Sequence, residues 1–366
     1  MKKIFINEIF NLEDFKESIP FTALGARTCY SAGGLDYLLN DPRIISKENR
    51  AKFLSKLGNY KHFSVFAHSF AYKDLTDLDE KIIDKYLDKE FLNLPKTEKA
   101  KILALKIGAT HFKSHYNPKY PTVIGVSLRH YLEDLLEYDE GEYFKAFEKM
   151  AEYDIPVEPL GKEENTTLIG LIKEYDGYAV FFIDDISRVC THQLVRHTSL
   201  NYSQRSQRYV KEDENQFIIP PSIKESSCKI KNEELSKYIK GMLSIFLEEL
   251  ERVEDIKPDL KDKVITAIRN KLNSISNGSI KLEDLFINFD NLAETIYEYA
   301  VYKCKVKRED GRFILPHGRK TTIVVSGTLS WIKDFIVKRT DIHAQWEIRN
   351  IANQMKKLLE KEGIEL

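Results

Sequence analysis

One segment of the chain gathers side chains that could bind an anionic, planar ligand. Residues 193–210, QLVRHTSLNYSQRSQRYV, contain three arginines, one histidine, three serines, three glutamines and two tyrosines, without an acidic residue. Arginine forks bind phosphate oxygens in pairs, and hydroxyls and amides supply further donors. This composition favours a site for a phosphate and a heterocycle. A basic exposed segment or a polar interface strip is the plainer alternative.

Three consecutive residues in this segment could form the anion site. In a tight turn or at a helix start, the backbone N–H groups of Ser206, Gln207 and Arg208 would converge on one anion, and the Arg208 side chain would add a charge-assisted pair. The alternative is a nucleophilic Ser206 with His197 as its base. Because no GxSxG pattern surrounds Ser206, we favour ligand binding.

A second group of basic residues follows near the end of the sequence. Arg312 precedes LPHG, and Arg339 begins RTDIHAQWEIR. Arg339 and His343 are four positions apart, so they share one face if a helix already runs there. An arginine aimed at a heterocycle carbonyl would stabilise negative charge that develops on it. The plainer alternative for Arg339 is a salt bridge to Asp341 or Glu347.

A third group is His62, Ser64 and His68, within an aromatic-rich segment that predicts a strand over residues 62–73. The two histidines are six positions apart and would lie on one face of a regular strand. Without a nearby acid or cysteine, a metal site is not favoured, and no metal is expected. Hydrogen bonding to a cofactor or ordinary burial explains these residues better.

Composition restricts the class of protein that must hold these groups. The chain has 366 residues and a formal net charge of -1, so a bulk nucleic-acid binder is disfavoured and an anion site must be local. Four widely separated cysteines indicate reduced thiols, and we expect a cytoplasmic protein. Neither a signal peptide nor a membrane-spanning run is recognisable.

The periodicity predicts a mixed fold of helices and strands. Strands are expected over residues 1–10 and 62–73, and helices over 46–57, 231–253 and 341–362. Residues 177–197 predict a buried strand followed by a helix, and residues 312–339 predict a loop, a strand and a helix. Residues 74–177 are rich in charge and show mostly helical spacing, which predicts a helical insertion. The segments 121–135 and 321–335 share one cadence of strand, glycine and helix.

The segments named above resemble, in their order, the flavin-dependent thymidylate synthases, the ThyX family. The family's hallmark is Arg-His-Arg, then seven residues, then Ser; here Arg196, His197 and Thr198 are followed by seven residues and Ser206. The other matching segments are GARTCYS, KHFSVFAHSFAY, ISRVCTHQLVRH, YSQRSQRYV, GRFILP with IVVSG beyond it, and KRTDIHAQWEIR.

The resemblance implies a fold and a reaction. It implies an α/β (α+β) fold, a mixed sheet flanked by helices, formed by residues 1–73 and 178–366 around the helical insertion at 74–177. Such enzymes convert dUMP to dTMP with a methylene group from methylenetetrahydrofolate. Reduced FAD supplies the hydride, and NADPH usually reduces the flavin. The resemblance also implies a homotetramer whose active sites are shared between subunits.

By motif position, each predicted ligand residue receives a role. The residues implied for dUMP are Gln193, Arg196, Gln204, Ser206, Gln207, Arg208, Arg312 and Arg339. Of these, Arg339 is the implied catalytic residue, because it would favour the N3-ionised, enolate-like pyrimidine. The residues implied for FAD are Ser64, Arg196, His197, Thr198, Gln204, Asp334 and His343.

Departures from the family pattern gather on the flavin side. Thr198 replaces the second arginine of the hallmark, and Ala67 stands where a glutamate is usual. Thr328 and Ser330 stand where an Asn and an Arg commonly contact the cofactor, and Asp334 where another Asn is frequent. Residues 74–177 could supply replacement contacts, with Arg129 and His130 as candidates.

Two other functions remain open from the sequence. One is a related enzyme that modifies another pyrimidine nucleotide, with altered or lost use of flavin, because Gln193 and Gln204 could bind more than one base edge. The other is a nucleic-acid-binding module that uses residues 193–210 as a stacking strip. The near-neutral charge disfavours this module.

Overall fold

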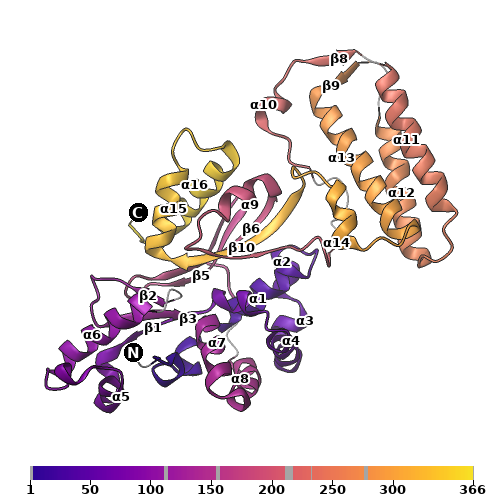
Figure 1. Ribbon diagram of the computed structural model, residues 1–366. Coiled ribbons are helices and arrows are strands. Elements are labelled where there is room, and N and C mark those ends of the chain that lie inside the picture. The colour runs from indigo at the N-terminus through magenta and orange to yellow at the C-terminus, as the bar shows by residue number, and fades with distance from the viewer. Residues whose placement is uncertain are drawn as a thin grey trace. The chain divides into compact units, whose positions relative to one another are not determined.

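A computed structural model of the chain describes residues 3–110, 114–153, 157–210, 217–231, 233–275 and 279–365. These residues form two compact units (Figure 1). The first unit comprises Met1–Asp184, Gln193–Gln204 and Thr322–Leu366, and the second unit comprises Asp185–His192 and Arg205–Thr321. Both units contain helices and paired strands, so the predicted mixed class is confirmed.

Helices make up most of the first unit. Its α-helices are α1 (Ile19–Cys29), α2 (Leu35–Leu39), α3 (Pro42–Ile45), α4 (Lys47–Asn59), α5 (Glu80–Lys85), α6 (Lys96–Thr110), α7 (Leu128–Tyr138), α8 (Glu140–Glu152), α15 (Leu329–Arg339) and α16 (Trp346–Lys361). Its 3₁₀ turns are η1 (Ile6–Glu8), η2 (Leu12–Phe15), η3 (Phe63–His68), η4 (Leu75–Asp77) and η5 (Lys89–Phe91). Helix α9 (Arg188–Leu194) begins in the second unit and ends in the first.

Two antiparallel sheets lie within or begin in the first unit. One has the order β1-β3-β2, with β1 (Phe70–Asp74), β2 (Ser114–Tyr116) and β3 (Val123–Ser127). The other has the order β4-β5-β6-β10-β7, with β4 (Gly161–Glu163), β5 (Thr166–Ile172), β6 (Tyr178–Ser187), β7 (Asn201–Gln204) and β10 (Lys320–Thr328). The register of β7 on β10 sets Gln204 opposite Ile323.

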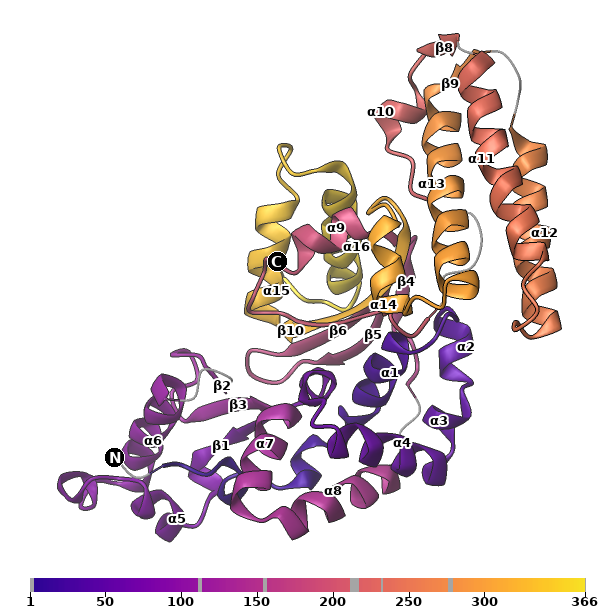
Figure 2. The same cartoon turned by 45° about the vertical axis from the view of Figure 1, so that its right-hand side comes forward.

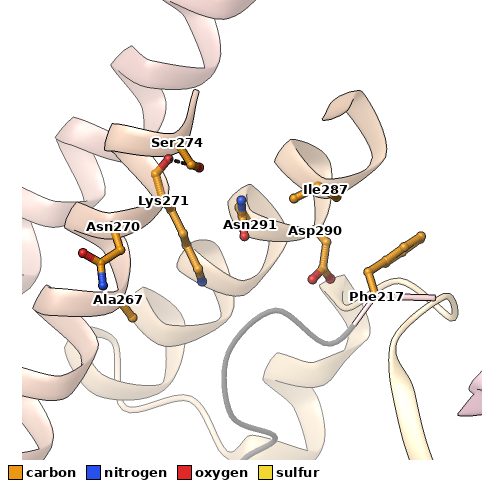
Figure 3. Close-up of a pocket in the computed structure, with 8 residues that line it drawn as sticks. All are labelled: Phe217, Ala267, Asn270, Lys271, Ser274, Ile287, Asp290 and Asn291. Carbon is orange, nitrogen blue, oxygen red and sulfur yellow. Dashed lines mark hydrogen bonds between the residues drawn. The ribbon is translucent and has the colours of Figure 1, made fainter. Parts of the chain in front are cut away.

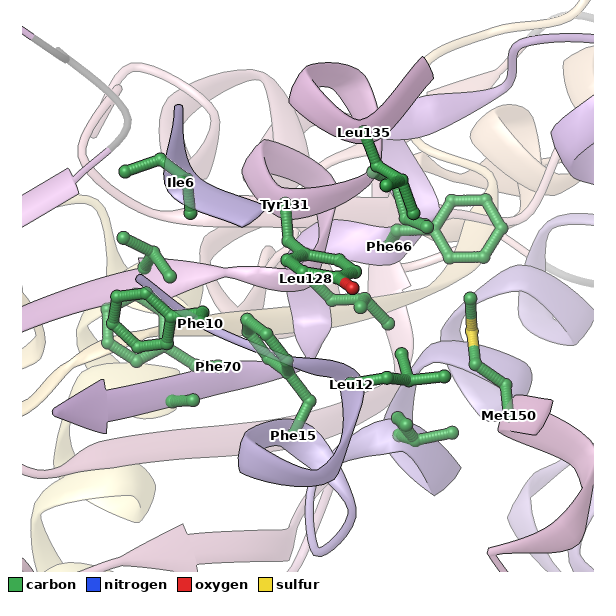
Figure 4. Close-up of a cluster of buried hydrophobic side chains, with 14 of the residues drawn as sticks. Ile6, Phe10, Leu12, Phe15, Phe66, Phe70, Leu128, Tyr131, Leu135 and Met150 are labelled. Carbon is green, nitrogen blue, oxygen red and sulfur yellow. The ribbon is translucent and has the colours of Figure 1, made fainter. Parts of the chain in front are cut away.

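Aromatic side chains fill the core of the first unit. Phe10 and Phe15 lie with ring centroids 6.0 Å apart, and Phe15 lies 5.5 Å from Tyr131 of α7. Figure 4 shows this cluster, with Phe66 of η3 and Phe70 of β1 among its members. Burial of such rings is a main source of folding free energy. The core therefore anchors η3, β1 and α7 to one another.

Two strands of the first unit continue into helices without a connecting loop. Ser127 ends β3, and its hydroxyl accepts the N–H of His130 to cap α7. In the same way, β10 ends at Thr328 and α15 begins at Leu329. The shared cadence of segments 121–135 and 321–335 is thus confirmed as strand followed by helix. This junction fixes α15 relative to the sheet.

Two strand predictions are wrong in whole or in part. Residues 3–10 contain the 3₁₀ turn η1 and no strand, because Ile6, Ile9 and Phe10 all turn toward the core instead of alternating between two faces. In the segment 62–73, only the part from Phe70 onward is a strand. The preceding η3 is a 3₁₀ turn, since Val65 to His68 are buried in succession.

The stretch 74–177 is more mixed than its spacing suggested. It supplies helices α5 to α8, as predicted, but also strands β2 to β5. All of them belong to the first unit together with residues 1–73. The buried residues Leu132 of α7 and Phe147 of α8 join the same hydrophobic cluster as the N-terminal aromatic rings. That this stretch is an insertion into the family's fold stays a prediction.

Three long helices dominate the second unit. They are α11 (Glu233–Glu251), α12 (Pro258–Ser274) and α13 (Leu282–Glu298), which lie side by side in Figures 1 and 2. Shorter elements of this unit are α10 (Pro221–Lys224), β8 (Lys229–Lys231), β9 (Ser279–Lys281), a π-helical turn η6 (Tyr299–Lys303), α14 (Arg308–Gly311) and η7 (Arg312–Ile314). Leu250, Val264 and Ile268 form part of the bundle's core.

A buried ionic network joins α12 and α13 to the segment before β10. The Arg319 Nε lies 2.8 Å from the Asp290 Oδ1, and its Nη2 lies 3.0 Å from the Glu294 Oε2. Lys271 pairs with the same Glu294. Lys271 and Asp290 also line a cavity of about 350 Å³ (Figure 3). None of the residues that line it is a predicted site residue.

The four cysteines are all free thiols and fall into two classes. Cys29 of α1 and Cys190 of α9 are buried, whereas Cys228 and Cys304 of the second unit are exposed. Burial raises the pKa of the Cys29 thiol to about 11. A buried thiol with so high a pKa is a poor nucleophile at neutral pH.

Candidate active site

The first unit places Arg339 at the end of a rigid support. Helix α15 follows β10 directly, and Arg339 is its last residue, beside Lys338. Cations are favoured in the last turn of a helix because the carbonyl groups there carry partial negative charge. Thr340 closes the helix through its N–H, which binds the carbonyl of Ile336. The arginine is half-buried at this end of α15.

The guanidinium of Arg339 is held by a histidine from another segment of the first unit. Its Nε donates to the Nε2 of His197 over 2.8 Å. A ring nitrogen that accepts a hydrogen bond carries no proton, so the imidazole is neutral and its proton lies on Nδ1. Burial lowers the pKa of His197, and the charge of Arg339 lowers it further. These effects favour the neutral ring.

The turn that carries His197 is itself fixed by hydrogen bonds. The Tyr202 hydroxyl of β7 lies 2.7 Å from the carbonyl oxygen of Leu194 and 2.8 Å from that of His197. The His197 ring meets the Phe335 ring of α15 edge-on, with centroids 4.9 Å apart. Backbone and ring are therefore both restrained where Arg339 arrives.

The outer fork of Arg339 is open to a ligand. Among the residues that the structure describes, neither Nη1 nor Nη2 of Arg339 has a hydrogen-bond or ion-pair partner. The alternative of a salt bridge from Arg339 to Asp341 or Glu347 is not seen among the described residues; Asp341 instead accepts from the backbone N–H and the Nδ1 of His343. The positive charge of Arg339 is thus uncompensated and its paired donors are free to bind two adjacent acceptors.

The predicted helix face shared by Arg339 and His343 does not exist. Helix α15 ends at Arg339 and α16 begins at Trp346, so residues 340–345 form a connection between helices. The Asp341 carboxylate binds backbone within that connection, which competes with helix continuation. The His343 side chain is 91% exposed.

The other predicted residues of the first unit lie on or near its surface. Arg196, Thr198 and Ser64 are exposed, while Gln193 and Gln204 are half-buried, the latter at the end of β7. Asp334 is exposed and pairs with Lys338 over 2.7 Å. The structure thus joins Arg339 to His197 but provides no contact that tests the remaining assignments.

A second set of predicted residues meets in the second unit. Ser206 begins a tight turn in which its Oγ accepts the N–H of Arg208 over 3.2 Å. The Arg208 side chain forms an ion pair with Glu309 of α14, with Nη2 to Oε2 at 3.0 Å. Arg312 donates from its Nε to the backbone carbonyl of Glu309. Glu309 therefore gathers Arg208 and Arg312, and Gln207 is buried in the same turn.

The nucleophile alternative for Ser206 has no support in these contacts. An activated serine donates its proton to a base, and the contact seen at the Ser206 Oγ is one in which it accepts the Arg208 N–H within its own turn. The proposed base, His197, already accepts from Arg339 at its Nε2. Ligand binding by Ser206 and His197 stays a prediction.

Two of the departures on the flavin side are engaged within the first unit. Thr328 is buried, and its Oγ1 lies 3.1 Å from the Oγ of Ser330. Ser330 donates to the Asp176 carboxylate over 2.6 Å. The same carboxylate binds His115 at 2.6 Å and Asn117 at 3.1 Å. Although burial opposes it, hydrogen bonds from His115 and Ser330 hold the pKa of Asp176 below its usual range.

Ala67 and Arg129 have partners within the first unit. The backbone carbonyl of Ala67 accepts from the Tyr178 hydroxyl over 2.8 Å. Arg129 pairs with Glu133 one turn away on α7, at 2.9 Å, and His130 is buried. That Arg129 and His130 supply flavin contacts stays a prediction.

His68 is a structural histidine. It is fully buried, with Nδ1 at 2.8 Å from the Ser326 hydroxyl of β10 and Nε2 at 2.8 Å from the Ser203 hydroxyl of β7. Burial lowers the pKa of His68 to about 3. His62 instead lies beside the Tyr30 hydroxyl, at 3.0 Å. The same-face argument for a strand fails because these residues flank or belong to η3.

The described residues contain neither a metal-binding cluster of side chains nor a membrane-spanning helix. Groups of three or more His, Cys, Asp or Glu side chains that could hold a metal ion are absent from them. Within the same residues, every helix is too short or too polar to cross a bilayer.

Several contacts could not be found by reading the sequence. Glu309 binds Arg208, a predicted dUMP ligand. Asp176 binds Ser330, which stands where the family commonly contacts flavin. The partners are separated by 101 and 154 positions. The only local signal for Glu309 is its place three residues before Arg312. Tyr202 could have been considered from the sequence, since it lies inside the segment 193–210 that predicts the site.

Comparison with known proteins gives one family. The model of the family described as "Thymidylate synthase complementing protein" matches residues 177–362, about half of the chain. Similar curated proteins are flavin-dependent thymidylate synthases. That of Clostridium tetani is 34% identical over 175 residues, 48% of this chain and 55% of the relative. That of Thermococcus onnurineus is 31% identical over 226 residues, 60% of this chain and 67% of the relative.

The similarities cover only part of the relatives. The chain spans about half the length of the Clostridium tetani relative and of one from Mycobacterium marinum, of which 53% is covered at 31% identity. Crystal structures of ThyX from Helicobacter pylori with FAD and dUMP are 17% and 14% identical, and cover 51% and 80% of this chain. The matched regions make up 69% and 92% of the Helicobacter pylori chains, and each match has a TM-score of 0.30.

Proposed function

Because the chain belongs to the thymidylate synthase complementing protein family, we propose that it catalyses the reductive methylation of dUMP to dTMP. Methylenetetrahydrofolate would be the carbon donor, reduced FAD the hydride source and NADPH the reductant of the flavin. The observation that carries this proposal is Arg339, whose guanidinium is oriented by His197 while its outer fork has no partner among the described residues.

The free fork suits the pyrimidine ring of dUMP. A uracil that has lost its N3 proton presents a ring nitrogen and a carbonyl oxygen side by side, which match two parallel N–H donors. Positive charge beside that edge stabilises the ionised ring, and the electron density it gains makes C5 nucleophilic. We therefore assign Arg339 as the catalytic residue, with Gln193, Arg196 and Gln204 as further ligands of dUMP.

Cysteine chemistry is disfavoured at the two buried thiols. Activation of uracil by a thiolate needs an accessible cysteine of lowered pKa. Cys29 has a raised pKa, and both Cys29 and Cys190 are buried, so neither of these two thiols is accessible to a uracil ring. Polarisation by arginine removes the need for such a nucleophile.

The residues of the second unit suit the phosphate. Ser206, Gln207, Arg208 and Arg312 combine a hydroxyl, an amide and two guanidinium groups. Phosphate would replace the Glu309 carboxylate on Arg208, because both are anions that accept paired N–H donors. We propose these four residues as phosphate ligands of dUMP.

The polar residues of the first unit fit a flavin. Arg196 offers an exposed cation, and His197 and Gln204 offer hydrogen-bonding groups, as binding of a dinucleotide requires. We propose that they bind FAD together with Ser64, Thr198, Asp334 and His343. When bound, FAD supplies the hydride that completes the methyl group, and the protein positions the reacting partners.

The proposal includes the assembly and the setting of the enzyme. We infer a homotetramer with active sites shared between subunits, acting in the cytoplasm on small molecules and not on nucleic acid. The support is the family membership together with the formal net charge of -1. Sedimentation of the purified protein would test the tetramer, since a monomer at micromolar concentration would contradict it.

One assay tests the central proposal. The purified protein is incubated with dUMP, methylenetetrahydrofolate, FAD and NADPH, and dTMP is measured by chromatography. An absorbance scan before and after addition of FAD records whether flavin binds. We expect a flavin spectrum and dTMP that depends on every component. A colourless protein that takes up no FAD and forms no dTMP would contradict the proposal.

One observation favours a second candidate, a related enzyme with another pyrimidine nucleotide and altered flavin use. Thr328 and Ser330, at positions where the family commonly contacts flavin, are engaged with each other and with Asp176. The same assay with dCMP and UMP in place of dUMP distinguishes the two candidates by their product.

A further inference from the structure

We propose that His197 is a positioning residue, whose neutral imidazole accepts the Nε–H of Arg339 and thereby aims the outer guanidinium fork. The inference rests on the proposed function only in placing Arg339 at the pyrimidine. The contact itself, from the Arg339 Nε to the His197 Nε2 at 2.8 Å, joins two side chains of the protein and involves no ligand. His197 thus has a task in addition to any contact with the flavin.

The two partners come from segments that are held independently. Arg339 ends α15, which is continuous with β10. His197 sits in a turn whose carbonyls at 194 and 197 are both bound by the Tyr202 hydroxyl. A long arginine side chain loses rotamer freedom when it is fixed, and here that ordering occurs before a ligand arrives. An ordered donor pair binds and stabilises charge more effectively than a mobile one.

A neutral acceptor is better suited to this task than a carboxylate. A carboxylate would neutralise the guanidinium and compete with a ligand for its fork. The His197 ring uses one N–H of Arg339 and leaves both the positive charge and the fork available. The local charge pattern maintains this state: Arg339 and Lys338 disfavour a proton on His197, and Asp334, which favours one, is paired with Lys338.

The arrangement has a defined dependence on pH. Protonation of His197 would place an N–H against the N–H of Arg339 and break the contact. The pKa of His197 is lowered from its ordinary value of 6.5 by burial and by Arg339. The contact is therefore complete above this lowered pKa and is lost as the pH falls through it. We expect kcat to decline on the acid side with this group.

Two substitutions separate positioning from a merely structural role. His197→Gln keeps an acceptor oxygen near the place of Nε2 but cannot titrate, whereas His197→Leu removes the acceptor. We expect His197→Leu to lower kcat by roughly 100-fold, the scale of an angstrom-sized misplacement, with a smaller change in KM for dUMP. His197→Gln should recover most of kcat and lose the acid limb. Equal loss in both variants, with the acid limb unchanged in His197→Gln, would overturn the proposal.

A measurement without catalysis tests the contact directly. In ¹⁵N-labelled protein, the Nε–H of Arg339, assigned by its absence in Arg339→Lys, should be protected from exchange, and an unprotonated Nε2 should identify the His197 tautomer. His197→Leu should abolish the protection and His197→Gln should keep it. His317→Gln, at an exposed histidine of the second unit, is the matched control and should change neither signal.

These outcomes distinguish the inference from the proposed function. If the wild-type protein forms no dTMP but shows the protected Nε–H and its loss in His197→Leu, the proposed function fails and the positioning contact stands. If dTMP forms but the Nε–H of Arg339 exchanges freely in the wild-type protein, the proposed function stands and the role of His197 is wrong.

Discussion

Two arginines with proposed roles at one nucleotide are held in opposite ways. Arg339 of the first unit is half-buried and donates to a neutral histidine, and no carboxylate of the described residues compensates its charge. Arg208 of the second unit is 49% exposed and paired with the Glu309 carboxylate. The first is an oriented donor awaiting a ligand, and the second is a neutralised donor that must exchange one anion for another.

The difference matches the two chemical tasks. A developing charge on a ring must be met by a donor that is already in place, because reorganisation during the reaction raises the barrier. Phosphate carries its charge before it binds and can displace a carboxylate at the surface, where such an ion pair contributes only about 0–1 kcal/mol. The contrast predicts that substitutions at Arg339 act on turnover and those at Arg208 act on binding.

The largest expected effect is at Arg339. Arg339→Ala should lower kcat by roughly 100- to 1,000-fold, as for loss of one donor to a developing anion, while the thermal unfolding temperature changes little. Arg339→Lys keeps the charge without the fork, so its kcat should lie between those of the wild-type protein and Arg339→Ala. Steady-state kinetics with saturating dUMP measures the effect. Near-normal kcat in Arg339→Ala would remove this residue from the mechanism.

A smaller effect is expected at Arg208, and on a different quantity. Arg208→Ala should weaken dUMP binding by roughly 10- to 100-fold, since a hydrogen bond to a charged group contributes about 1.5–3 kcal/mol. Deoxyuridine, which lacks the phosphate, is the control and should bind both proteins alike. Calorimetric titration gives the two dissociation constants. An equal penalty for dUMP and deoxyuridine would show that Arg208 does not bind the phosphate.

A cation added beside His197 should strengthen the binding of FAD. Thr198→Arg restores the arginine of the family hallmark and should tighten FAD binding by roughly threefold to fivefold, within the 0–1 kcal/mol of an exposed ion pair. The new charge should also lower the pKa of His197 further. Titration followed by flavin absorbance measures the affinity, with Thr198→Gln as an uncharged control. If both variants bind FAD equally, charge at position 198 is unimportant.

The smallest expected effect comes from freeing Arg208. Glu309→Gln removes the competing carboxylate but keeps a similar shape, so dUMP should bind about twofold tighter at low salt. The gain should shrink as salt increases, because exposed charges are screened over about 10 Å at 0.1 M. Titrations at two salt concentrations test this. Weaker dUMP binding in Glu309→Gln would indicate that Glu309 positions Arg208 instead of competing for it.

Local features of the fold could be read from the sequence because local physics determines them. Helix α4 was predicted from its spacing, and Ser46 caps it by accepting the N–H of Asn49. The strand prediction at residues 3–10 was wrong because their apolar side chains are buried around a turn, which a two-residue period cannot describe. The predicted start of the last helix at residue 341 was wrong, because Asp341 accepts the His343 N–H in a non-helical connection and α16 begins only at Trp346.

The site was only partly predictable for a related reason. Arg196, His197, Ser206 and Arg208 stand close together in the sequence, and the hallmark pattern identifies them. The partners that define how these residues are held lie far away: Arg339 is 142 positions from His197, and Glu309 is 101 from Arg208. Sequence spacing indicates which side chains can do chemistry, while tertiary contacts decide which are free.

Because β10 and α15 are directly joined, the number of residues in α15 determines the direction of the Arg339 side chain. With no loop to absorb a change, the 11 residues of α15 set the azimuth of its last side chain. One residue added inside this helix would swing Arg339 by about 100° around the axis and slide it about 1.5 Å, out of reach of His197. Adding seven would restore the azimuth to within about 20° yet carry the guanidinium some 10 Å too far. The length of α15 is thus constrained as tightly as the identity of the residue at its tip.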